Sequence, residues 1–205
     1  MRCDFIAENL SLSVIAVSLS TSVSACRNGR APSARISAGK GDRRTLNIRA
    51  ANPGDVKAMS ELMIGLTQKY IAGDCSAEGA DHLLQLVAPA AIEVRMQSSY
   101  DYHLAEEDHY LAGIIAMKDH KHLYQLFVAE TWHNRGVARR LWEFALERSL
   151  GQGNPGEFTV NSSMYARPVY ERFGFVPTSG KKEDGGVVYQ PMKLCLGRKD
   201  DMRSR

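Results

Sequence analysis

The pattern of hydrophobic and polar positions begins to predict structure at Leu46. Residues 45–51 (TLNIRAA) alternate between apolar and polar side chains, as the residues of a half-buried strand do. Residues 52–66 (NPGDVKAMSELMIGL) instead place apolar side chains three and four positions apart. This spacing predicts a helix that packs along one face, with Asn52 or Asp55 as its N-cap.

A second helical stretch covers residues 77–97. We expect it to be interrupted at Pro89, because proline removes a backbone hydrogen bond from the interior of a helix. Three strand-like runs follow, at residues 100–108, 109–119 and 122–130. Their connections are short, and short connections join antiparallel neighbours. The pattern therefore predicts an antiparallel meander.

Helical periodicity returns at residues 136–149 and is ended by the sequence GQGNPG. The remaining pattern predicts a strand at residues 157–162, a short helix at 165–173 and a last strand at 187–196. The predicted order is β-α-α-β-β-β-α-β-α-β. This order describes a mixed α/β domain over residues 46–196.

The two ends of the chain lack this periodicity. We expect residues 1–45 to be an N-terminal extension outside the folded domain, and residues 197–205 to be a charged C-terminal tail. The formal charge of the chain is +3, of which the first 45 residues contribute +4 and the last nine +2. Residues 46–196 therefore carry −3, so a nucleic-acid-binding surface on the domain is not expected. A protein that binds nucleic acid through its basic ends remains an alternative, and trimming those ends would test it.

The N-terminal extension has three alternative interpretations as a targeting segment. Residues 10–26 form an apolar and hydroxyl-rich run with the length of a signal-peptide core, but too short and polar to span a bilayer. The sequence VSAC would suit lipoprotein processing at Cys26, and residues 27–44 are rich in arginine and serine, like a transit peptide. We expect an unstructured extension and a cytoplasmic protein without a membrane partner, with targeting as the alternative.

The cysteines show no paired spacing of the kind that holds a metal ion. There are four: Cys3, Cys26, Cys75 and Cys195. We therefore expect free thiols in a reducing compartment and no metal.

The start of the helix at residues 136–149 carries unusual charge. Gly136 lies among three arginines, Arg135, Arg139 and Arg140. Cations are unfavourable at a helix N-terminus but become favourable when an anion binds there, because the free N–H groups of the first turn attract negative charge. The stretch therefore predicts an anion site, although a tight turn with solvated arginines is the alternative. It is neither a Walker loop nor a G-x-G-x-x-G dinucleotide motif.

At this helix start the chain resembles a known family. HNRGVA, residues 133–138, is similar to the Q/R-x-x-G-x-G/A signature of the GNAT superfamily of acetyl-coenzyme A-dependent N-acetyltransferases. His133 stands in the Gln/Arg place, whereas Gly136 and Ala138 match.

A second stretch strengthens the resemblance. VNSSMYARPVYERFGF, residues 160–175, resembles the superfamily's late strand and helix. The matching positions are Ala166, Tyr170, Gly174 and Phe175. The resemblance covers residues 46–195 and implies a GNAT-like fold, in which helices flank a mixed and mostly antiparallel sheet.

The resemblance also implies where acetyl-coenzyme A would bind. The pyrophosphate would lie on the loop formed by His133, Asn134, Arg135, Gly136, Val137, Ala138 and Arg139. The pantetheine arm would lie in a V-shaped gap between the strand ending at Val128 and the strand carrying Asn161. It would pair with the backbone around Phe127 and Val128, and one amide there would polarise the thioester carbonyl. Ser163 stands where many relatives have an asparagine that contacts pantetheine, and Asn161 could preserve that contact.

For the chemistry, the resemblance implies Tyr170 as general acid toward the leaving thiolate, with Tyr165 as a weaker second. An amine attacks only when neutral, so a base or a water chain leading to one is expected. Gln125 stands where many relatives place a glutamate on the fourth strand; it cannot titrate but could position a water. The side chains that could serve as base by chemistry are Glu106, Glu107, Asp108, His122 and Glu130. We take Tyr170, Gln125 and Glu130 as the catalytic candidates.

The predicted function is therefore acetyl transfer from acetyl-CoA to an amine of a small molecule, by direct attack in a ternary complex. The sequence AEED, residues 105–108, suggests a cationic acceptor. Two alternatives remain: a non-catalytic acyl-CoA-binding sensor, which the absence of a glutamate at Gln125 leaves open, and an acetyltransferase acting on protein amines. A homodimer is left open as well.

Overall fold

The computed structural model describes residues 46–71 and 75–197. The expectations for residues 1–45, including Cys3 and Cys26, and for residues 198–205 lie outside these ranges. Within them, no helix is long and apolar enough to cross a membrane. No group of three or more His, Cys, Asp and Glu side chains is arranged to hold a metal ion in the same ranges.

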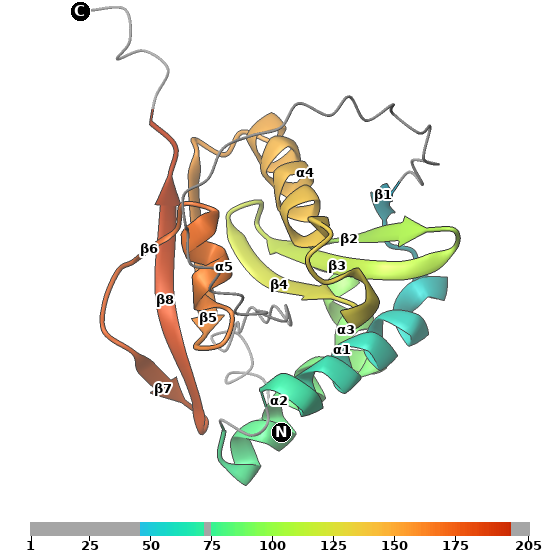
Figure 1. Cartoon of the computed structure of the whole chain (residues 1–205), viewed down its shortest axis with the longest axis horizontal. Helices are drawn as coiled ribbons and strands as arrows, with labels where there is room; N and C mark the ends of the chain where they lie inside the picture. The colour runs from blue at the N-terminus through green and yellow to red at the C-terminus, as the bar shows by residue number, and fades with distance from the viewer. Residues whose placement is uncertain (1–45, 72–74, 198–205) are drawn as a thin grey trace, which may run out of the picture.

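The expected order of elements is confirmed, with three additions besides the two short 3₁₀ helices η1 and η3 (Figure 1). The second helical stretch is two helices that part at Pro89, and two strands of two and three residues, β6 and β7, precede the last one. The elements are β1 (Asn47–Ala50), η1 (Pro53–Asp55), α1 (Val56–Tyr70), α2 (Ala77–Leu86), α3 (Pro89–Met96), β2 (Tyr100–Glu107), β3 (Tyr110–Lys118), β4 (His122–Val128), η3 (Glu130–Trp132), α4 (Val137–Gly151), β5 (Glu157–Ser163), α5 (Arg167–Arg172), β6 (Val176–Pro177), β7 (Lys182–Asp184) and β8 (Val187–Cys195).

The strands form one sheet in the order β1-β2-β3-β4-β5-β8-β6, with β7 also paired to β8. All pairs are antiparallel except β4 with β5, which are parallel. This parallel pairing consists of His122 with Thr159 and Leu123 with Val160. Beyond these residues β4 and β5 diverge (Figure 1), which opens the sheet in the middle.

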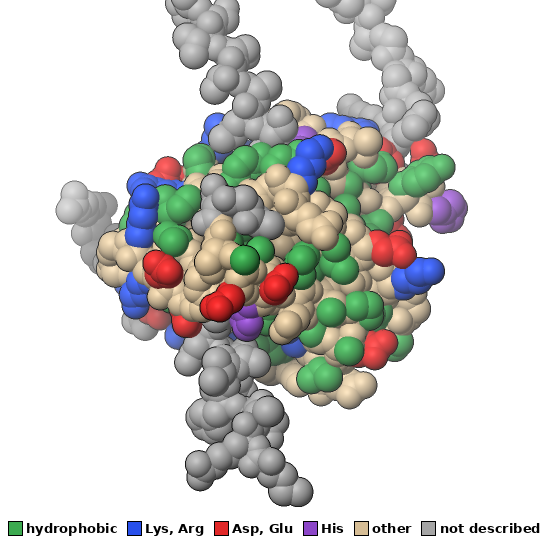
Figure 2. Space-filling view, turned by 90° about the horizontal axis from the view of Figure 1, so that it is seen from below, with side chains coloured by type: hydrophobic (Ala, Val, Ile, Leu, Met, Phe, Trp, Pro, Cys, Tyr) green, Lys and Arg blue, Asp and Glu red, His purple; other side chains and the backbone are tan. Residues whose placement is uncertain are grey.

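A hydrophobic core lies on each face of the sheet. Helices α4 and α5 cover one face, where Trp142 packs against Phe158 and Phe175. Helices α1, α2 and α3 cover the other face with a second cluster that includes Met59 and Met63, both fully buried. Seen from below Figure 1, the surface mixes acidic, basic and apolar side chains (Figure 2).

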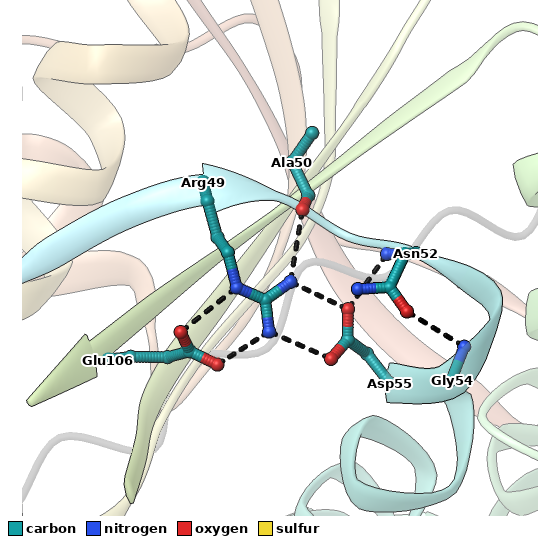
Figure 3. Close-up of polar contacts among 6 residues, drawn as sticks. All are labelled: Arg49, Ala50, Asn52, Gly54, Asp55 and Glu106. Carbon is teal, nitrogen blue, oxygen red and sulfur yellow. Dashed lines mark hydrogen bonds and ion pairs between the residues drawn. The ribbon is translucent and has the colours of Figure 1, made fainter. Parts of the chain in front are cut away.

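Arg49 on β1 fixes the start of α1 (Figure 3). Its guanidinium donates to Asp55 Oδ2 at 2.7 Å and to Glu106 Oε1 of β2 at 2.6 Å. Asn52 and Asp55 form a capping box, in which Asn52 accepts from Gly54 N and Asp55 accepts from Asn52 N. The hydrogen bond from Arg49 lowers the pKa of Asp55. The N-terminal end of α1 is therefore held to β1 and β2.

Candidate active site

Strand β4 carries a bulge where it leaves its pairing with β5. Its register to β3 passes from Ala116 opposite Gln125 to Met117 opposite Leu123, so Tyr124 is an extra residue. Bulges re-aim side chains and are common beside active sites. Gln125 is buried on the open stretch of β4, and its Oε1 accepts a hydrogen bond from the Tyr102 hydroxyl at 3.1 Å. The bulge and this bond fix the amide beside the gap.

The loop after β4 exposes the start of α4. Asn134 and Gly136 both have left-handed backbone angles, with φ of 60° and 78°. A Cβ atom on Gly136 would meet no atom within 4 Å, so the glycine is required by its backbone conformation and not by packing. The space in front of it is open, as an anion site on the first turn requires.

A cavity of about 350 Å³ lies at this loop, between the start of α4 and helix α5. The residues predicted to bind the coenzyme that do line it are Val128, His133, Asn134, Gly136, Val137, Ala138 and Arg139. Four other lining residues were not predicted from the sequence: Trp132, Val169, Arg172 and Phe173. Arg139 of α4 and Arg172 of α5 both line the cavity, and Arg139 Nε also donates to Glu143 Oε1 at 2.7 Å. Arg172 follows Val169 by three residues and so shares its helix face, which is a signal that the sequence already contained.

Arg135 is the expected loop residue that is not among the residues lining this cavity. Its Nη2 donates to Glu107 Oε2 at 2.8 Å, and Trp132 Nε1 donates to the same oxygen at 2.9 Å. The guanidinium also lies 5.8 Å from the centre of the Trp132 ring. The Glu107 side chain is only 9% exposed. Arg135 and Trp132 together therefore fasten the loop to the end of β2.

His133 stabilises the other side of the loop. Its Nε2 lies 2.8 Å from the carbonyl oxygen of Val128. A carbonyl only accepts, so Nε2 carries the proton. The Gln/Arg position of the family signature thus supports the last residue of β4.

The expected bases lie in different places. Glu106 is paired with Arg49, Glu107 with Arg135, and Asp108 lies in the turn after β2. His122 lies at the closed end of β4, 2.7 Å from Thr159 Oγ1, and burial lowers its pKa to about 4. Glu130 differs, because it lines a cavity of about 400 Å³ together with residues of α1.

The carboxylate of Glu130 is held by two neighbours on α1. The Tyr70 hydroxyl donates to its Oε1, and Lys69 Nζ lies 2.5 Å from the same oxygen. The bond from Lys69, then that from Tyr70, lowers the pKa of Glu130. A carboxylate with a lowered pKa is ionised at neutral pH and is a weak base.

Tyr170 and Tyr165 occupy different environments. Tyr170 is 0% exposed and packs edge-on against Phe173 and Phe175. Tyr165 lies after β5 and its ring stacks on that of Tyr70, 5.4 Å between centroids. Both stacked rings line a further cavity of about 300 Å³, whose other lining residues are Ile71, Cys75, Ser163, Met164 and Val188.

The remaining predicted residues lie along the gap itself. Phe127 and Val128 are buried on β4 and pair with Ile114 and Gly113 of β3. Asn161 is half-buried on β5 and pairs with Pro191 of β8. These residues thus lie on the two strands that part, as the V-shaped gap requires.

Comparison with known proteins identifies the class. Residues 71–196 match the family described as acetyltransferase (GNAT) domain. The chain belongs to the GNAT family and is an acetyltransferase. A search of curated proteins found no match.

Solved structures share the fold. A GCN5-related N-acetyltransferase from Rhodopseudomonas palustris has 17% identity and a TM-score of 0.64, covering 74% of this chain and 96% of its own. A PaiA N-acetyltransferase from Thermoplasma acidophilum in complex with coenzyme A has 17% identity and a TM-score of 0.61, covering 74% and 99%. A spermidine/spermine N-acetyltransferase, SpeG, from Vibrio cholerae has 20% identity and a TM-score of 0.51, covering 78% and 100%.

Proposed function

We propose that this acetyltransferase takes its acetyl group from acetyl-CoA and transfers it to an amine of a small molecule. The parting of β4 and β5 beside the loop cavity carries the proposal. The open edge of β4 offers backbone N–H and C=O groups that a pantetheine arm can pair with, as an added strand would. Arg139 and Arg172 line the cavity and would supply positive charge for the pyrophosphate. The coenzyme complex of the Thermoplasma relative is consistent with this use of the fold.

The acceptor amine would enter the cavity lined by Tyr70, Ser163 and Tyr165. An amine of pKa about 10.4 costs roughly 4–5 kcal/mol to deprotonate at pH 7. Gln125 cannot titrate, and Glu130 is a weak base in its pairing with Lys69. The proton therefore leaves through water, with Gln125 positioned to orient one. The neutral nitrogen then attacks the thioester carbon directly.

Tyr170 would protonate the leaving thiolate. A tyrosine of pKa about 10 and a thiol of about 8.5 make full transfer uphill by roughly 2 kcal/mol, so a hydrogen bond or partial transfer is sufficient. Tyr170 is buried in one hydrophobic cluster with Val128 of β4 and Val160 of β5, so the coenzyme sulfur would have to enter the gap to reach it.

The test is the turnover of Tyr170→Phe across pH, with an acceptor found by an amine panel. The change removes one hydroxyl and keeps the ring packing. Loss of a general acid is expected to lower turnover by about 100- to 10,000-fold, while acetyl-CoA affinity changes much less. Tyr110→Phe, at a tyrosine that is 68% exposed, is the control. A Tyr170→Phe enzyme within threefold of the parent at every pH would remove Tyr170 from the mechanism.

Two observations favour a second candidate, an acyl-CoA sensor without turnover: Gln125 stands at the expected base position, and Tyr170 is fully buried. The same panel separates the two functions. A thiol-reactive dye detects coenzyme A released by transfer. Acetyl-CoA binding without thiol release for any amine would identify the sensor.

A further inference from the structure

The ends of three elements meet at one carboxylate beside the gap. Tyr70 ends α1, Glu130 follows β4, and Tyr165 follows β5. With Lys69 they form what we call the Glu130 corner. Tyr70 belongs both to this corner, through its bond to Glu130, and to the cavity of about 300 Å³, through its stacking on Tyr165. Glu130 and Lys69 line the cavity of about 400 Å³, and Tyr70, which bonds to Glu130, lines the cavity assigned to the acceptor.

The Glu130 corner already holds one ammonium group, that of the chain's own Lys69. The Lys69 ammonium lies 2.5 Å from Glu130 Oε1 and 5.4 Å from the centre of the Tyr70 ring. A carboxylate and an aromatic face are the two groups that attract a primary ammonium most directly. Lys69 thus stands in for an ammonium ligand.

This pairing is easy to displace. The side chains of Lys69 and Glu130 are 58% and 43% exposed, and exposed pairs on long flexible side chains contribute little to stability. The carboxylates around Arg49 are held differently, because two of them share one guanidinium in a half-buried network (Figure 3). Lys69 can leave Glu130 at small cost.

The neighbouring cavity supplies no competing charge of its own. Its lining among the described residues is aromatic, aliphatic, sulfur-containing or hydroxyl-bearing. The coenzyme cavity carries Arg139 and Arg172, which repel a cation. A cationic group that extends past Tyr70 therefore meets Glu130.

We propose that Glu130 and the Tyr70 ring bind a second ammonium group of the acceptor, in place of Lys69, so that the enzyme selects diamines. The bound group is not the reacting one, because a carboxylate stabilises the protonated amine and only the neutral amine attacks. This inference rests on the proposed amine acetylation. Lys69 then competes with the substrate for Glu130. Glu130 promotes binding of the diamine, whereas Lys69 opposes it.

The test compares 1,4-diaminobutane with butylamine, which lacks the second ammonium. In the parent enzyme kcat/KM is expected to favour the diamine by up to about fivefold, the upper end of what an exposed ion pair provides. The readout is the ratio of kcat/KM for the diamine to kcat/KM for butylamine. Glu130→Gln should bring this ratio to about one, and Lys69→Met should raise it severalfold above that of the parent. Lys57→Met, which breaks the exposed Lys57–Glu61 pair on the same helix, is the matched control and should leave the ratio unchanged.

A purely structural ion pair would move both variants in the same direction and both acceptors alike. That result, or equal use of the two acceptors by the parent, would overturn the inference while acetyl transfer stood. If no amine is acetylated, the proposed function fails. Calorimetry with 1,4-diaminobutane then measures separately whether the Glu130 corner binds a diamine. Binding that Glu130→Gln abolishes and Lys69→Met tightens would support it, and the absence of binding would overturn it.

Discussion

The two ends of strand β4 are built in opposite ways. At the closed end, His122 and Leu123 pair with Thr159 and Val160 of β5, and the His122 ring bonds to Thr159. At the open end, residues Gln125 to Val128 do not pair with β5. The closed end is completed by the sheet itself, whereas the open end leaves backbone groups to which a ligand can pair.

Side chains replace the missing strand as supports of the open end. Val128 keeps its pairing to Gly113 of β3, and His133 holds its carbonyl group. The following loop is fastened by Glu107, through Trp132 and Arg135. A binding site in an interrupted sheet thus depends on a few long-range polar contacts.

The largest effect is expected at the open end. Gly136→Glu would place a carboxylate in the open space where the pyrophosphate is proposed to lie, and like charges in contact cost several kcal/mol. Coenzyme A affinity measured by calorimetry should fall by roughly 100-fold or more. Since Gly136 has φ of 78°, strain alone could weaken the loop.

Gly136→Asn controls for that strain, because asparagine tolerates left-handed angles and adds no charge. We expect it to bind coenzyme A within about tenfold of the parent. Unchanged affinity in Gly136→Glu, at an unchanged melting temperature, would show that the phosphates bind elsewhere.

The parts of this comparison were not equally predictable from the sequence. Helix α4 and the meander follow from local periodicity, and the glycine-containing helix start is a local signal as well. Strands β6 and β7 were missed, because two and three exposed residues show no period. The contact of Arg135 with Glu107 also could not be predicted from the pattern of hydrophobic and polar positions. Its partner Glu107 lies 28 residues earlier, and only the folded sheet brings them together.

An effect of intermediate size is expected at the closed end, on the pH dependence of the free energy of unfolding. Burial lowers the pKa of His122 to about 4, against about 6.5 in an unfolded chain. The folded state therefore binds fewer protons between these values, so the free energy of unfolding falls as the pH falls through this window. From pH 7 to pH 5 this loss amounts to about 2 kcal/mol, or roughly 30-fold in the unfolding constant.

Urea unfolding at both pH values measures the loss. His122→Asn can still bond to Thr159 but does not titrate, so its loss between pH 7 and pH 5 should be smaller than that of the parent by this amount. His109→Asn, in the exposed turn between β2 and β3, is the control. Parallel pH profiles for the parent and His122→Asn would contradict a neutral, buried histidine at the closed end.

The smallest effect concerns the contact that fastens the open end, and it decides the role of Arg135. Glu107→Gln keeps the size of the side chain but removes the charge that holds Arg135 and Trp132. If that contact orders the loop, coenzyme A affinity should fall by about tenfold, because binding must then order the loop itself. Arg135→Gln should fall by a similar amount, and the double variant by no more, because both changes break one contact. If Arg135 instead binds phosphate directly, Glu107→Gln should release it and leave affinity equal or higher, whereas Arg135→Gln alone should weaken binding. Calorimetry on the three variants separates a loop support from a phosphate ligand.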